Sequence, residues 1–220
     1  MADNFLEKRE EALRNAPLKH SSLGTQSLDT LLLKNRSTRG YDKSYKVHRR
    51  QLEAILSVAD KIPTARNQQV LRFRLILHDE ADKVLPLIGM GRALPELHLP
   101  FPGTEPEAFI VICTAFPNAP HLGFDEGICA QSMMLKAVQI GLNGLIIKNF
   151  SPARLSESLD LGLNPDGLPY LPLTVLAFGK SAENIVLEPY DGEDINYYRK
   201  EDGTHVVPKI PARELEIKAH

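Results

Sequence analysis

Hydrophobic side chains recur at helical spacing in two segments near the start of the chain. Residues 27–34 place three leucines on one helical face behind Ser27, which is a candidate N-cap. Residues 48–63 carry apolar side chains at i, i+3, i+4 and i+7, counted from Leu52. This spacing predicts two amphipathic helices, and Pro63 is expected to end the second.

Four other segments have the patterns of β-strands. Residues 71–78 alternate arginine with Phe and Leu, which predicts a strand with one wetter face. Continuous apolar runs fill residues 108–116 and 173–180, as is typical of strands buried on both faces. Residues 144–150 predict a shorter strand.

The longest predicted helix occupies residues 126–141, with Asp125 as its expected N-cap and Gly141 at its end. Apolar side chains occur on nearly every face of this helix. A helix that is apolar all round is buried, either within a domain or at a subunit interface.

The other segments are shorter or irregular. Residues 79–88 and 151–159 predict short helices, the second of them starting with Ser-Pro. Residues 89–107 are rich in Gly and Pro and predict a loop or lid. From residue 181 onward we expect a polar and irregular tail.

Strands and helices are mixed but do not alternate as βαβ units, so the pattern favours an α+β sandwich over a doubly wound sheet. The chain has no internal repeat, low-complexity segment or obvious linker. We therefore expect one domain at residues 27–220, preceded by a polar arm at 1–26 with a short helix at 5–13.

Composition agrees with a single globular domain. The 220 residues are 43% hydrophobic and 25% charged, enough to bury a core without a disulfide or metal. The net charge of −2 provides no general attraction for nucleic acid or acidic membranes. The seven histidines lack metal-binding spacing, so no metal site is expected.

The two cysteines, Cys113 and Cys129, lie in apolar surroundings and are not in a CxxC motif, which predicts buried free thiols. The N-terminal residues lack the apolar core of a secretory signal, and no window reaches the roughly 18 apolar residues of a membrane helix. We therefore expect a cytoplasmic protein.

Two polar clusters carry candidate chemistry. Residues 36–39 place two arginines around two hydroxyls, a donor set that suits a phosphate but also occurs in charged surface turns. Residues 63–69 include three consecutive amide side chains, which suit a ring with alternating C=O and N–H groups, such as a pyrimidine edge. An ordinary capped loop is the alternative for the second cluster.

The order and spacing of these clusters resemble the FMN-dependent nitroreductase family. Residues 35–41 (NRSTRGY) correspond to its R-R-S-x-R motif with a following aromatic, and residues 63–71 (PTARNQQVL) to its P-S-x-x-N-x-Q-P-W motif. The helix at 125–142, the loop and strand at 170–180 and the VPK sequence at 207–209 are also similar to the family. The resemblance extends from about Ser27 to the C-terminus.

Two departures from the family pattern affect the expected contacts. Asn35 replaces the family's leading arginine, which removes one phosphate contact, and Val70-Leu71 replaces its Pro-Trp.

The resemblance implies a nitroreductase-like α-β-α sandwich with a mostly antiparallel central sheet, in an intertwined homodimer with FMN at the interface. Arg36, Ser37 and Arg39 would contact the phosphate, ribityl chain or pyrimidine edge, and Arg39 is the candidate for stabilising the anionic reduced flavin. The remaining implied cofactor contacts are Asn67 and Gln69 at the isoalloxazine, Ile147 and Lys148 beside flavin N5, and Lys209 at the phosphate.

The implied activity is that of an oxidoreductase carrying electrons from NADH or NADPH through flavin N5 to nitroaromatics, quinones or similar acceptors. No side chain is assigned as an acid or base. The alternatives are a flavin-binding or scaffold protein of the same fold without turnover, or a reductive dehalogenase or dehydrogenase.

Overall fold

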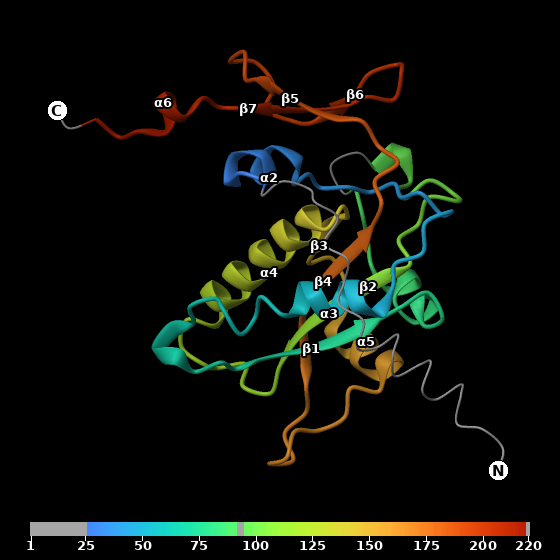
Figure 1. The fold of residues 1–220 in the computed structure, drawn as a ribbon, viewed down its shortest axis with the longest axis vertical. Helices are drawn as coiled ribbons and strands as arrows, with labels where there is room; N and C mark the ends of the chain where they lie inside the picture. The colour runs from blue at the N-terminus through green and yellow to red at the C-terminus, as the bar shows by residue number, and fades with distance from the viewer. Residues whose placement is uncertain (1–25, 92–94, 219–220) are drawn as a thin grey trace, which may run out of the picture.

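The computed structural model of the chain describes residues 26–91 and 95–218. The predicted arm, except for Gln26, and its helix at 5–13 lie outside the described residues. A four-stranded sheet forms the centre of the molecule in Figure 1, with strand order β1-β2-β4-β3 and antiparallel pairing between all neighbours. Its strands are β1 (Leu71–Ile76), β2 (Ala108–Thr114), β3 (Asn143–Ile147) and β4 (Leu171–Gly179). All four strands match the predictions.

Helices cover both faces of the central sheet. One face packs against α3 (Arg49–Leu56) and α4 (Leu122–Gln139). The other packs against α5 (Pro152–Leu159) and the short 3₁₀ turns that replace the helix expected at 79–88. The predicted α+β sandwich is therefore confirmed.

The alternation of side chains in the fully buried strand β2 produces this sandwich. Ile110 and Ile112 lie in the core beneath α3 and α4, whereas Phe109 and Val111 lie in the core beneath α5. Successive side chains of a strand point to opposite faces, so a continuous apolar run fills two cores at once.

The helix α2 (Leu28–Lys34) begins as predicted, because the Ser27 hydroxyl accepts a hydrogen bond from the backbone N–H of Thr30 at 3.2 Å. Its leucines are largely uncovered within this chain: Leu28 is 61% and Leu33 66% exposed.

The helix α3 ends at Leu56 with Ser57 as its C-cap, so Pro63 is not what ends it, contrary to the prediction. Hydrogen-bonded turns occupy the following residues, with bonds from the N–H groups of Val58, Ala59 and Lys61 to the carbonyl three residues earlier in place of the helical bond to the fourth.

The prediction that Asp125 caps α4 was wrong. The helix begins at Leu122, with His121 at the N-cap in a left-handed conformation (φ 63°). Asp125 lies inside the first turn, is only 1% exposed, and accepts a hydrogen bond from the backbone N–H of Ala65 at 2.8 Å. Gly141 follows the helix with a positive φ of 83°, as the predicted end requires.

The prediction of an irregular tail was also wrong. The tail forms a second, three-stranded sheet of β5 (Ile185–Pro189), β6 (Tyr198–Arg199) and β7 (His205–Lys209), followed by α6 (Ala212–Leu215). The strand β7 pairs in parallel with β5 and antiparallel with β6. In Figure 1 this sheet lies at the top of the molecule, beside α2 and away from the central sheet.

Cys113 and Cys129 are buried free thiols, as predicted, and burial raises the pKa of each to about 12. Within residues 26–91 and 95–218, no helix has the length and apolar character needed to cross a membrane.

Candidate functional site

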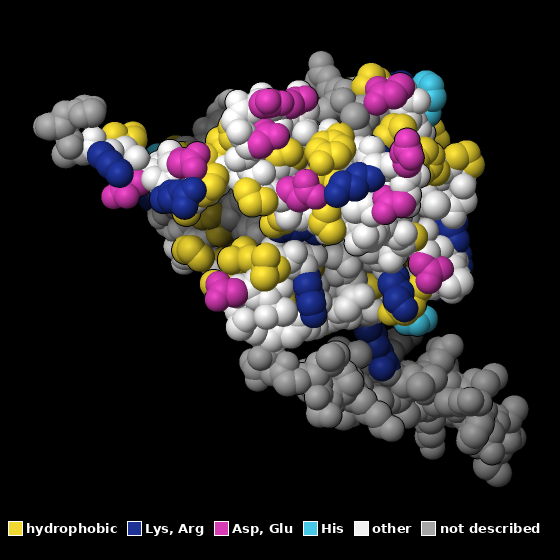
Figure 2. Space-filling model, turned by 90° about the horizontal axis from the view of Figure 1, so that it is seen from above, with side chains coloured by type: hydrophobic (Ala, Val, Ile, Leu, Met, Phe, Trp, Pro, Cys, Tyr) yellow, Lys and Arg dark blue, Asp and Glu magenta, His cyan; other side chains and the backbone are white. Residues whose placement is uncertain are grey.

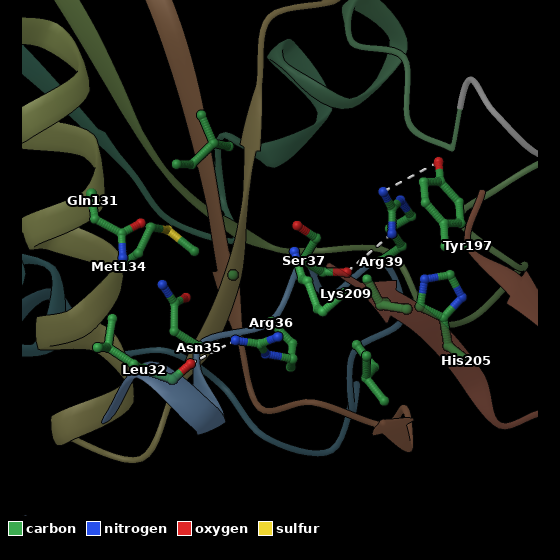
Figure 3. A pocket seen from close by; sticks show the side chains of 14 residues that line it. Leu32, Asn35, Arg36, Ser37, Arg39, Gln131, Met134, Tyr197, His205 and Lys209 are labelled. Atoms are coloured by element: carbon green, nitrogen blue, oxygen red, sulfur yellow. Dashed lines mark hydrogen bonds between the residues drawn. The ribbon is translucent and has the colours of Figure 1, made fainter. Parts of the chain in front are cut away.

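A pocket of about 350 Å³ lies where the segment after α2 meets β3, α4 and the small sheet (Figure 3). Its lining residues are Leu32, Asn35, Arg36, Ser37, Arg39, Gln131, Met134, Gly144, Ile146, Ile185, Tyr197, His205, Val207 and Lys209. The pocket thus joins parts of the chain that are remote in sequence.

The 35–41 segment is held against β3 by backbone pairing. Ser37 forms a parallel bridge with Gly144, and the N–H of Thr38 donates to the Gly144 carbonyl at 3.0 Å. A Cβ at position 144 would lie 2.3 Å from the Ala177 carbonyl oxygen, so only glycine fits there. The Tyr41 hydroxyl donates to the Thr38 carbonyl at 2.7 Å and fixes the end of the segment.

Three cationic side chains, those of Arg36, Arg39 and Lys209, line this pocket, and none of its described lining residues is acidic. The pocket is therefore positively charged in a chain whose net charge is −2. On the face that Figure 2 presents, by contrast, acidic and basic side chains are interspersed.

Arg36 and Arg39 are positioned by contacts with their own surroundings. Nη2 of Arg36 donates to the Leu32 carbonyl at 2.6 Å, and Nη1 of Arg39 donates to the Ser37 carbonyl at 3.1 Å. The Arg39 guanidinium lies 4.9 Å from the ring centre of Tyr197, in the geometry of a cation–π contact. Burial lowers the pKa of Arg36 without removing its charge.

Glu183 connects the small sheet to the arginine segment. Its carboxylate accepts from the backbone N–H of Arg39 and forms a buried ion pair with Arg199 of β6. A backbone hydrogen bond of 3.0 Å from Ala182 to Gly40 adds to this connection. The small sheet is thereby fixed beside the pocket.

Two buried donors in this pocket suit an anionic ligand. The Nε atoms of Arg36 and Arg39 are buried and have no hydrogen-bond partner among the residues the structure describes. Leaving a buried charged donor unpaired is costly, and a phosphate offers several acceptor oxygens. The donor set therefore fits the phosphate end of FMN.

Of the eight predicted cofactor contacts, the structure brings Arg36, Ser37, Arg39 and Lys209 together in this pocket. Asn67 and Gln69 are outside it, on the exposed turn after α3, where Nε2 of Gln69 donates to Oδ1 of Asn67 at 3.0 Å. Both residues have positive φ, and so does Arg66. Left-handed backbone conformations are costly for residues other than glycine, so this turn is strained.

Ile147 and Lys148 are also outside the pocket within this chain. Ile147 is buried in the core on the α5 side of the sheet, and its neighbour Ile146 lines the pocket instead. Strand alternation accounts for this offset of one residue. Nζ of Lys148 lies 2.6 Å from the Glu126 carboxylate and donates to the Leu173 carbonyl at 2.7 Å.

Sequence reasoning did not assign Gln131, Tyr197 or His205 to the site, although all three line it. One signal was present for His205: the alternation in HVVPK places positions 205, 207 and 209 on one strand face. No local pattern marks Tyr197, because the pairing of β6 with β7 determines its position.

The fold is similar to that of several solved structures. A nitroreductase family protein from Streptococcus pneumoniae has a TM-score of 0.61 and 15% identity, over 88% of this chain and 100% of the other. A candidate NAD(P)H:FMN oxidoreductase from Staphylococcus epidermidis has a TM-score of 0.59 and 17% identity, over 88% and 96%. An FMN-dependent nitroreductase from Clostridium difficile has a TM-score of 0.52 and 21% identity, over 70% and 87%.

No family model matches the sequence, and no curated protein matches it either. The structural similarities show that the chain has the nitroreductase fold, as the sequence motifs predicted. The chain shares this fold with the three proteins above at sequence identities of only 15–21%.

Proposed function

We propose that the chain binds FMN in the cationic pocket and acts as an NAD(P)H-dependent oxidoreductase. The observation that carries this proposal is the convergence of Arg36, Arg39 and Lys209, with Ser37, on one pocket of a nitroreductase fold, with no acidic side chain among the described lining residues. Solved proteins of similar fold include an FMN-dependent nitroreductase and a candidate NAD(P)H:FMN oxidoreductase, which supports the same cofactor and reductant here.

The residues of this chain would bind and orient the cofactor. Arg36, Ser37 and Lys209 would hold its phosphate and ribityl chain, and Arg39 would stabilise negative charge on the reduced ring system. When bound, FMN supplies a nitrogen that accepts hydride from a nicotinamide and passes electrons to an acceptor. We propose nitroaromatics, quinones and similar electron-poor molecules as acceptors.

We also propose that the working unit is a homodimer. The exposed apolar side chains of α2 and α4, namely Leu28, Leu32, Leu33, Phe124 and Ile128, suit burial against a second copy. The helix α4 combines a buried face with this exposed apolar one. In a dimer, Asn67, Gln69 and Lys148 would complete a flavin site across the interface.

Flavin content tests the cofactor assignment directly. We expect purified protein to be yellow, or to take up FMN, and to bleach anaerobically on addition of NADH or NADPH. Colourless protein that does not take up FMN would contradict the flavoenzyme proposal.

Turnover separates the enzyme from a flavin-binding protein of the same fold. Bound FMN that neither nicotinamide reduces would favour the binding-only alternative. If the cofactor is reduced, reoxidation by a quinone, a nitroaromatic or a halogenated aromatic in parallel assays separates the proposed activity from reductive dehalogenation.

A further inference from the structure

His205 is an enclosed histidine in the wall of the cationic pocket. It is the first residue of β7, is 2% exposed, and lines the pocket on the same strand as Lys209. Nδ1 of its ring is buried and lacks a hydrogen-bond partner in the described part of the chain. The function proposed above gives this side chain no role.

The ring of His205 belongs to a cluster of three side chains, visible in Figure 3. Its centre lies 5.0 Å from that of Tyr197, and Tyr197 lies in turn against the Arg39 guanidinium, 4.9 Å away. Tyr197 thus connects the imidazole to Arg39, one of the cations that would hold an anion.

The charges around His205 come from three elements. Arg39 of the 35–41 segment and Arg199 of β6 oppose a positive charge on the imidazole, whereas Glu183, just before β5, favours one. Desolvation by burial is the largest cause of its lowered pKa, followed by the two arginines. Without a ligand the ring is consequently neutral near pH 7.

A bound phosphate would reverse this balance. A phosphate group carries a charge of roughly −1.5 to −2 near pH 7. Placed among Arg36, Arg39 and Lys209, that charge favours the protonated imidazole and offsets the repulsion from the arginines, which adds to burial in lowering the pKa of His205.

We propose that His205 takes up a proton from solvent when a phosphate group binds in the cationic pocket, so that cofactor binding and protonation of this histidine are coupled. The proton adds to the ring nitrogen that carries no hydrogen in the neutral imidazole, and no bond of the cofactor changes. This inference rests on the proposed function, in which the phosphate is that of FMN.

The coupling has a defined sign. Anion binding raises the pKa of His205 from its lowered value in the free protein, so affinity increases as pH falls between the free and bound pKa values. One coupled proton changes affinity by at most about tenfold per pH unit. The phosphate itself also titrates, with a pKa of about 6. Its contribution to the pH dependence of affinity must be subtracted from the measured dependence to obtain that of His205.

Calorimetry provides the test. FMN is titrated near pH 7 in two buffers of different ionisation enthalpy, so the difference in heat measures the protons taken up. The variants are His205→Gln, which has an uncharged amide at this position, and His78→Gln, an exposed control. Riboflavin serves as the ligand without phosphate, and inorganic phosphate as the ligand without a flavin.

We expect the wild type and His78→Gln to take up more protons with FMN than His205→Gln does, by up to about one per site. Riboflavin should show no such difference, and inorganic phosphate should show it. Equal uptake in all three proteins, with FMN bound, would overturn the coupling while leaving the proposed function intact.

The other outcomes are equally decisive. If FMN fails to bind but inorganic phosphate binds with His205-dependent uptake, the proposed function fails and the coupling stands. If neither ligand binds the wild type, both fail. If His205→Gln does not fold, NMR titration of the wild-type histidines replaces it. The coupling is refuted if ligand binding raises the pKa of none of them.

Discussion

At the scale of single residues, the three cations of the pocket differ in how they are held. Arg36 and Arg39 are each tied to a nearby carbonyl, and Arg39 is also covered by Tyr197. Lys209 comes from the other end of the chain, on β7. Because the two arginines are positioned in advance, these two side chains lose little entropy when an anion binds.

Replacing Arg36 tests the phosphate assignment. Arg36→Ala should weaken FMN binding by about 10- to 100-fold, because one charge-assisted hydrogen bond is worth roughly 1.5–3 kcal/mol. Arg154→Ala removes an exposed arginine from α5, across the sheet, and should leave affinity unchanged. Fluorescence titration of the flavin measures both, and unchanged retention by Arg36→Ala would contradict the assignment.

The two thiols give a second prediction at this scale. Because burial raises the pKa of Cys113 and Cys129 to about 12, neither forms appreciable thiolate at pH 8. A chromogenic disulfide reagent should therefore detect almost no thiol in native protein and two per chain after denaturation. Rapid labelling of the native protein would show that one of these sites opens.

Single residues were predictable from sequence where their neighbours formed a motif. Arg36, Ser37 and Arg39 adjoin one another, and Lys209 ends a short pattern that resembles the family tail. Tyr197 escaped prediction because only the small sheet brings it to Arg39.

At the scale of elements, α4 and the turn after α3 depend on each other. Buried Asp125 of α4 accepts a hydrogen bond from the Ala65 N–H, at the start of the turn that carries Arg66, Asn67 and Gln69 with positive φ. A strained turn persists only where its surroundings fix it, and Asp125 is one such restraint.

Removing this restraint should destabilise the protein. Asp125→Ala leaves the Ala65 N–H without its acceptor and should lower the free energy of unfolding by about 1–3 kcal/mol. Asp125→Asn retains an acceptor oxygen and should cost less. Urea denaturation measures both against Asp29→Ala, an exposed aspartate in the first turn of α2. Equal stability of the two alanine variants would refute this role.

Elements with long apolar runs were predictable, and those formed by long-range pairing were not. The central strands have their own hydrophobic patterns, whereas β6 has only two residues and exists through its pairing with β7. The start of α4 was misplaced because His121 and Gly123 do not mark a helix, and Asp125 has the side chain of a cap.

At the scale of the whole molecule, the described surface of one chain exposes apolar side chains that the proposed second copy would bury. Phe124 and Ile128, on one face of α4, are 73% and 39% exposed. Isolated exposed hydrophobic residues are common, but Leu28, Leu32 and Leu33 extend the apolar surface onto α2, which packs against α4.

Charge on this face should separate the subunits. The double variant Phe124→Asp, Ile128→Asp should sediment as a 24.5 kDa monomer, whereas the wild type should sediment as a dimer. Leu163→Asp places a charge at another exposed apolar position, on the loop after α5, and should remain dimeric. A monomeric wild type with bound flavin would contradict the interface proposal.

The span of the pocket along the chain also has a consequence for biosynthesis. Its walls are made from residues 32–39 and from β7, which ends at Lys209. A nascent chain can pair β1 with β2 early, but it cannot close the pocket until residue 209 has left the ribosome. Loading of the proposed cofactor would then be a late event, which follows assembly of the central sheet.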